Sequence, residues 1–168
     1  LKDKVPGVRE NAIKLAELYL DKQPALTEHL YQLQNDVDPK VRFQLLCTLG
    51  YLQTPKAAQI REALLFRDMQ DEWVQVAALS ASAAPTSALL EKTIAKFKAN
   101  DAGYAQLVKR LATLVVADKQ MEKVQGILDR SSISNKANGQ LNTALLSGLE
   151  EGFRREKLDS LLVKKWQT

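Results

Sequence analysis

A repeat of about 33 residues constrains this chain more than any other feature of its sequence. The segment "DVDPKVRFQLL" (36–46) has one counterpart earlier in the chain, "VPGVRENAIKL" (5–15), and another later, "DEWVQVAAL" (71–79). A helix pair of this length cannot bury its apolar face alone, whereas stacked copies bury a continuous core. The repeat therefore predicts a stack of similar helix pairs.

Proline residues mark where the helices of this stack should begin. All five prolines (Pro6, Pro24, Pro39, Pro55 and Pro85) precede apolar residues at helical spacing, and proline is favoured in a first helical turn. Asp38 and Thr54 can each cap the helix that follows. We expect ten short helices. The first members of the pairs are expected near 6–20, 39–52, 72–83, 101–117 and 138–152. The second members are expected near 24–35, 55–67, 86–99, 119–130 and 155–166.

Two ladders of apolar residues place the pairs in register, and positions four and eight residues apart share one helical face. The first-helix ladder is Val8, Val41, Val74, Val108 and Leu141, then Ala12, Leu45, Ala78, Ala112 and Leu145, then Ala16, Leu49, Ser82, Val116 and Leu149. The second-helix ladder is Leu26, Ile60, Leu90, Val124 and Leu158, then Leu30, Leu64, Ile94, Leu128 and Leu162. We expect both ladders to be buried stripes.

Recurring residues at the helix starts resemble the short kind of HEAT repeat. They are Pro6, Val8, Arg9 and Ile13 in the first copy and Asp38, Pro39, Val41, Arg42 and Leu46 in the second. The consensus residues of ankyrin and tetratricopeptide repeats, which have a similar period, are missing. The resemblance implies an all-α fold, a right-handed, armadillo-like α-solenoid of about five HEAT-like helix pairs. It also implies that Arg9, Asp38, Pro39 and Arg42 are structural, with the aspartate and arginines forming a hydrogen-bonded ladder between copies.

The extent of the repeats predicts one HEAT-like domain over residues 1–168. Its copies are expected near 6–36, 38–68, 71–99, 101–131 and 138–166. The segments "VRFQLLCTLGYL" (41–52) and "REALLFRD" (61–68) further resemble the HEAT segment of large bacterial multidomain proteins, between a sugar-dehydrogenase-like β-propeller and a c-type haem domain. That resemblance implies a fragment of an exported, periplasmic redox protein, and the parent protein would then be an enzyme such as a dehydrogenase.

Motifs that carry catalysis or bind a cofactor are missing from the sequence. It has no phosphate-binding glycine loop, no His-Glu-x-x-His and no Cys-x-x-Cys-His. His29 could be a general base, but a surface or half-buried imidazole beside Leu26 and Leu30 is the favoured interpretation. Cys47 could be a nucleophile, but the other copies place Lys14, Ser80 and Leu114 there, which favours an inert thiol. We expect no catalytic residue, metal site or cofactor.

Polar positions opposite the second-helix ladder form a strip that changes from acidic to basic. Its candidate partner-binding residues are Glu28, Gln32, Glu62, Phe66, Lys92, Lys96, Arg130 and Lys164. A strip polarised in this way would orient an elongated partner. Unselected surface charge is the alternative explanation.

The net charge of +4 is divided unevenly, −1 over residues 1–84 and +5 over residues 85–168. The favoured function is a non-catalytic scaffold or spacer that mediates protein–protein or interdomain contacts. The alternative is a nucleic-acid-binding protein, similar to HEAT-like DNA glycosylases, that uses the basic half. Its candidate residues are Lys92, Lys96, Lys98, Lys109, Arg110, Lys123 and Arg130. No apolar run suits a membrane span, so we expect no membrane insertion. The lone cysteine leaves the compartment open.

Overall fold

The computed structural model describes residues 1–20, 22–81, 85–98, 100–118, 123, 125–126 and 139–156. Over these residues the chain is all-helical and contains no strand, which confirms the all-α class. The chain divides into two compact units, Leu1–Ala83 and Ala84–Thr168, and each unit is described by itself. No helix in the described ranges is long and apolar enough to cross a membrane.

The first unit contains five α-helices and one short 3-10 helix within its described residues. They are α1 (Pro6–Glu17), α2 (Pro24–Gln32), η1 (Leu33–Asn35), α3 (Pro39–Leu49), α4 (Pro55–Asp68) and α5 (Glu72–Ser80). Proline occupies the start of α1, α2, α3 and α4, as predicted. The Asp38 carboxylate accepts a hydrogen bond from Lys40 N and the Thr54 hydroxyl accepts one from Ala57 N, so both predicted caps are formed.

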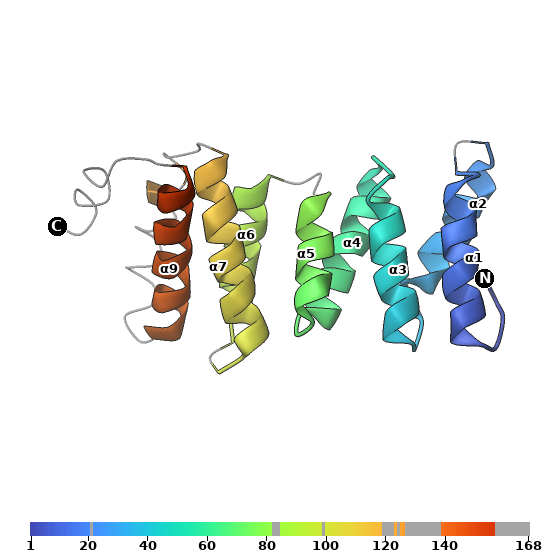
Figure 1. Cartoon of the computed structure of the whole chain (residues 1–168), viewed down its shortest axis with the longest axis horizontal. Coiled ribbons are helices and arrows are strands. Elements are labelled where there is room, and N and C mark those ends of the chain that lie inside the picture. Colours follow the sequence, from blue (N-terminus) through green and yellow to red (C-terminus); the bar gives the residue numbers. More distant parts are fainter. Residues whose placement is uncertain are drawn as a thin grey trace. The chain divides into compact units, whose positions relative to one another are not determined.

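Within the first unit, α1, α3 and α5 follow one another, and each packs on the next (Figure 1). Helix α4 packs against both α3 and α5. The first-helix ladder is buried in α3 and α5, as predicted, at Val41, Leu45, Leu49, Val74 and Ala78. In the first copy the prediction holds for Ala16, which is buried, but is wrong for Val8, which is 48% exposed, and for Ala12, which is partly exposed. No described helix precedes α1, so this face of α1 has no neighbouring helix among the described residues.

The second unit contains α6 (Thr86–Ala95), α7 (Ala102–Ala117) and α9 (Gly139–Arg155) in its described residues. Helix α7 packs on α6 and on α9. The predicted ladder is buried here at Val108, Ala112, Val116, Leu141, Leu145 and Leu149. Rungs Ser82, Val124, Leu128, Leu158 and Leu162 lie outside the described residues, while Leu90 is buried and Ile94 partly so.

Two glycines allow α9 to approach α7 closely. A Cβ on Gly148 would lie 2.3 Å from Lys109 O and 2.8 Å from the Cβ of Ala112. One turn later, a Cβ on Gly152 would lie 2.8 Å from the Cβ of Val116. The Thr113 hydroxyl donates to Gly148 O at 2.9 Å, so the two backbones are also joined by a side chain.

Several helix ends differ from those predicted. Helices α1, α3, α5 and α6 end three or four residues earlier than expected. The spacing of apolar residues does not indicate at which residue a helix ends. Helix α9 instead continues to Arg155, where another helix was predicted to begin. Its last turn holds Arg154 and Arg155, and basic groups are stabilised at a helix C-terminus. Most of the helices predicted at 119–130 and 155–166 lies outside the described residues.

Candidate functional site

A network around Arg9 joins the two ends of the first copy. Arg9 Nε donates to Asp36 Oδ2 and Arg9 Nη2 donates to Asp36 Oδ1, both at 2.7 Å. Arg9 Nη1 donates to the carbonyls of Asp3 at 2.8 Å and Lys4 at 3.2 Å. One guanidinium therefore holds both the segment before α1 and the segment after η1.

The same network recurs one repeat later around Arg42. Arg42 Nε and Nη2 donate to the two carboxylate oxygens of Asp68, at 2.7 and 2.6 Å. Arg42 Nη1 donates to the carbonyls of Asp36 at 2.7 Å and Val37 at 3.0 Å. Asp36 thus accepts from Arg9 through its carboxylate and from Arg42 through its carbonyl. This residue is the point at which two neighbouring copies are joined.

The acid in this network is not the one that the HEAT resemblance implied. Asp38 was expected to pair with the arginines, but its carboxylate caps α3, two residues beyond Asp36. In the third copy Gln75 replaces the arginine and is fully buried. Gln75 Nε2 donates to Met69 O at 2.7 Å, so it keeps the bond to the preceding segment with a neutral group. Arg9, Arg42 and Gln75 each bond a backbone carbonyl of the segment that precedes their helix.

The electrostatics of the network follow from its two-point geometry. Hydrogen bonds from the Arg9 guanidinium hold the pKa of the Asp36 carboxyl below its usual value, against the effect of burial. The pKa values of Arg9 and Arg42 are raised, because each guanidinium bonds a carboxylate, Asp36 and Asp68 respectively. Both pairs are largely shielded from water, with the Arg9 and Asp36 side chains 11% and 6% exposed.

A third buried arginine, Arg61, bonds only backbone carbonyls among the described residues. Its guanidinium donates to Ala78 O at 2.9 Å and to Ala81 O, at the end of α5. Burial lowers the pKa of Arg61. Cys47 is half-buried nearby, and its pKa is raised, first by burial and then by the charge of Glu17. A raised pKa leaves less thiolate at neutral pH, which does not suit a nucleophile.

The predicted strip residues of the first unit have ordinary surface surroundings. Glu28 pairs with Lys56 at 2.7 Å, and both side chains are exposed. The Lys56 ammonium also lies 4.7 Å from the ring centre of Tyr31, whose hydroxyl is 2.9 Å from Thr54 Oγ1. These contacts join the start of α4 to α2. Gln32 is exposed, but Glu62 and Phe66 are half-buried. Less of the Phe66 side chain is therefore accessible to a partner than the sequence indicated.

The predicted strip residues of the second unit are partly outside the described ranges. Lys92 and Lys96 are exposed on and just after α6, whereas Arg130 and Lys164 lie outside the described residues. Of the other basic candidates, Lys109 is 3.2 Å from the Glu151 carboxylate, which also pairs with Arg155. This acid reduces the positive charge available on α7 and α9 for a phosphate backbone.

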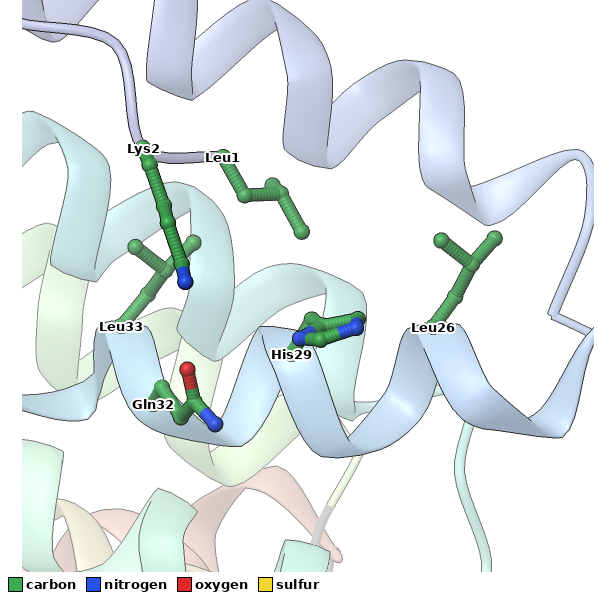
Figure 2. Close-up of a pocket in the computed structure, with 6 residues that line it drawn as sticks. All are labelled: Leu1, Lys2, Leu26, His29, Gln32 and Leu33. Carbon is green, nitrogen blue, oxygen red and sulfur yellow. The ribbon is translucent and has the colours of Figure 1, made fainter.

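A groove of about 530 Å³ lies between the N-terminal segment and α2 (Figure 2). It is lined by Leu1, Lys2, Leu26, His29, Gln32 and Leu33. Leu26 and Leu33 point from α2 and η1 toward Leu1 and Lys2, whose side chains point back toward the helix (Figure 2). His29 is exposed on this edge of α2, as the surface interpretation predicted. The groove is mostly apolar and is formed by residues of the first copy and the segment before it.

Sequence reasoning missed the acids and glycines that hold these contacts. Asp36 and Asp68 follow their arginines by 27 and 26 residues, a nearly constant spacing that would have identified them. Gly148 and Gly152 are four residues apart, so they share a helix face. In the described part of the chain no three His, Cys, Asp or Glu residues are grouped as metal ligands would be. The chain matches no protein-family model, no curated protein and no solved structure.

Proposed function

We propose that this chain is a right-handed α-solenoid of about five HEAT-like helix pairs that acts as a non-catalytic scaffold. Its role would be to hold other protein domains or partner proteins at a fixed spacing. In this proposal the arginine–aspartate junctions give the scaffold its stiffness, and the polar strip on the second helices offers the contact surface. The chain would serve as the spacer between the domains of a larger exported redox protein.

The recurrence of one junction in two successive copies carries the proposal. Arg9 and Arg42 make the same four kinds of hydrogen bond, and each joins its own copy to the segment before it. A set of hydrogen bonds that recurs at a constant spacing in the sequence favours repeats that are stacked in one direction in space. The packing of α1 on α3 and of α3 on α5 supports the same order.

X-ray scattering from the chain in solution tests the solenoid. A compact chain of 168 residues has a radius of gyration of about 15 Å, from the general scaling with length. Five helix pairs stacked at roughly 10 Å intervals would extend about 50 Å and give a larger value with an asymmetric distance distribution. A symmetric distribution with the compact radius would contradict the solenoid.

Cross-linking within the parent protein tests the scaffold role. We expect the exposed Lys92 and Lys96 to cross-link to residues outside 1–168, because they lie on the proposed contact strip. Lys40, exposed at the start of α3 and outside the proposed contact strip, is the control and should not. Cross-links confined to residues 1–168 would oppose a role in contacts between domains.

A salt series with duplex DNA separates the scaffold from the nucleic-acid alternative. The scaffold predicts no binding at micromolar protein, even at about 50 mM salt, where phosphate contacts are strongest. Binding that weakens steeply with salt, and that is lost on Lys92→Glu with Lys96→Glu, would favour the alternative instead.

A further inference from the structure

An exposed apolar stripe runs along one face of α1. Its members are spaced three or four residues apart, so they lie in line on the helix. They are Val5, Val8, Ala12, Leu15 and Leu18. Leu15 is 59% exposed and Leu18 is 70% exposed, whereas Ala16, at the edge of the stripe, and Ile13, on the other side of the helix, are buried. Helix α1 therefore has two apolar faces, and one of them has no neighbour among the described residues.

The equivalent face of α3 is covered, and α1 is what covers it. The residues of α3 that lie one repeat after Val8, Ala12 and Leu15 are Val41, Leu45 and Thr48, all 0% exposed. The Thr48 hydroxyl donates to the Glu17 carboxylate of α1, which places this face of α3 against α1. Because α1 covers this face of α3, an earlier first helix packed in the same way would cover the same face of α1. The stripe lies on that face.

Asp3 repeats the geometry of Asp36 with one bond missing. Asp36 Oδ1 accepts from Asp38 N at 2.9 Å, and Asp3 Oδ1 accepts from Val5 N at 2.8 Å. The Asp36 carbonyl accepts from Arg42, and the Asp3 carbonyl accepts from Arg9. The Asp36 carboxylate also receives the Arg9 guanidinium, but the Asp3 carboxylate, which is exposed, receives no guanidinium from the described residues.

The groove beside α2 is a second uncovered apolar feature of this copy. Leu26, on its wall, is partly exposed, whereas Ile60, the next residue of the second-helix ladder, is buried. The first and second helices of this copy thus both present uncovered apolar positions. The counterparts of Val8, Ala12, Leu15 and Leu26 in the following copy are covered, whereas Tyr51, the counterpart of Leu18, is 74% exposed.

We propose that the stripe of α1, the groove beside α2 and the Asp3 carboxylate together bind another helix pair of the same kind. This inference rests on the proposed repeat architecture. The first helix of that pair lies along the stripe and carries an arginine that bonds Asp3 as Arg9 bonds Asp36. Its second helix packs beside Leu26. Because Leu15 stands where α3 has Thr48, the bound helix has an apolar residue at the position equivalent to Glu17.

Continuity with the packing of α1 on α3 selects this occupant over a lipid surface or an unrelated peptide. A membrane would cover the apolar stripe but would supply no guanidinium for the Asp3 carboxylate. A second molecule of this chain would need to present an uncovered first helix with an arginine at the right distance. Arg9 and Arg42 are not available for this, because each already bonds an aspartate of its own repeat.

An in-frame duplication of residues 1–33, placed directly before Leu1 of the full chain, tests the proposal. The added Arg9 then precedes Asp3 by 27 residues, the separation of Arg9 from Asp36. Glu17 of the added segment is replaced by Leu to match the stripe. Hydrogen exchange of the α1 amides, followed by mass spectrometry, is compared between the extended chain and the original chain. We expect exchange at least about tenfold slower in the extended chain, since charge-assisted bonds and apolar burial are added.

Asp3→Asn identifies the role of the carboxylate. The amide keeps an oxygen acceptor for Val5 N but weakens the bond to a guanidinium. In the extended chain this variant should lose most of the added protection, and in the original chain it should change α1 exchange by less than about threefold. Glu10→Gln, which removes another acid of α1 outside the network, is the matched control and should keep the protection.

Each of the other results would overturn the proposal in its own way. A protected added segment with unchanged α1 exchange, or with no effect of Asp3→Asn, would reject this surface and leave the repeat architecture standing. An added segment that exchanges freely would contradict the stackable repeat as well. Sedimentation of the original chain as a dimer that Leu15→Glu converts to a monomer would make a second copy the occupant.

Discussion

Arg9 and Asp36 face each other through two parallel hydrogen bonds of 2.7 Å across 27 residues of chain. A two-point bond of this kind fixes the orientation of both groups as well as their distance. Since Arg9 also bonds the carbonyls of Asp3 and Lys4, the first copy is closed on itself at one end.

Removal of the acid partner of Arg42 should be costly. Asp68→Ala leaves a guanidinium whose side chain is 8% exposed without its carboxylate. Breaking a buried pair costs about 3 kcal/mol of unfolding free energy. Urea unfolding measured by Trp73 fluorescence in a Trp166→Phe background reports this change. Asp71→Ala, which removes only the cap of α5, is the control and should cost about 1 kcal/mol. Equal costs for the two variants would contradict a special role for the pair.

The stability of the first unit should fall in acid through Asp36. Its pKa is lowered in the folded chain, chiefly by hydrogen bonds from Arg9. The stabilisation is therefore fully present above the unfolded pKa, about 3.9, and is lost as pH falls through the lower folded pKa. We expect Asp36→Asn to be less stable than the wild type at pH 6, with a difference that shrinks below about pH 4. A difference that stays constant from pH 6 to pH 2 would oppose this assignment.

The close approach of α7 and α9 should not tolerate a side chain at Gly148. In Gly148→Ala the new methyl group would meet the backbone of Lys109, which cannot move aside without shifting the helix. Overpacking costs typically about 1–3 kcal/mol, and contact with backbone places this variant near the upper value. Gly139→Ala is the control, since nothing lies within 4 Å of that position. Thermal unfolding by circular dichroism should separate the two variants clearly.

Cys47 should react slowly with thiol reagents in the folded chain. Burial, and then the charge of Glu17, raises the pKa of its thiol, so less thiolate is present at any pH between 7 and 9. We expect labelling by a disulfide reagent to be slower than that of free cysteine and to reach the same rate in concentrated urea. Labelling as fast in the folded chain as in urea would show that the thiol is open and reactive.

The starts of the helices were predictable because proline and capping residues act locally. Pro6, Pro24, Pro39 and Pro55 begin helices for reasons contained in the first turn itself. The helix ends depend on how the following loop packs, so the predicted ends were less accurate. Val8 shows a different limit: its spacing is that of a buried residue, but burial requires a neighbour that periodicity alone does not supply.

The partners of the buried polar groups were less predictable. The HEAT resemblance implied Asp38 as the acid partner of Arg9 and Arg42, but the acid that bonds Arg9 is Asp36, two residues earlier. Choosing between two aspartates requires the course of the loop between η1 and α3. Arg61 gave no signal at all, because its bonds to Ala78 and Ala81 depend on the packing of α4 against α5.

The glycine contact between α7 and α9 has a consequence for how this sequence can vary over evolutionary time. Where side chains interlock, a change on one helix can be offset by a change of size on the other. Where the backbone of one helix lies against a missing side chain, as Lys109 O does at Gly148, no replacement on the facing helix restores the fit. We therefore expect Gly148 to stay fixed while the apolar residues around it exchange with one another.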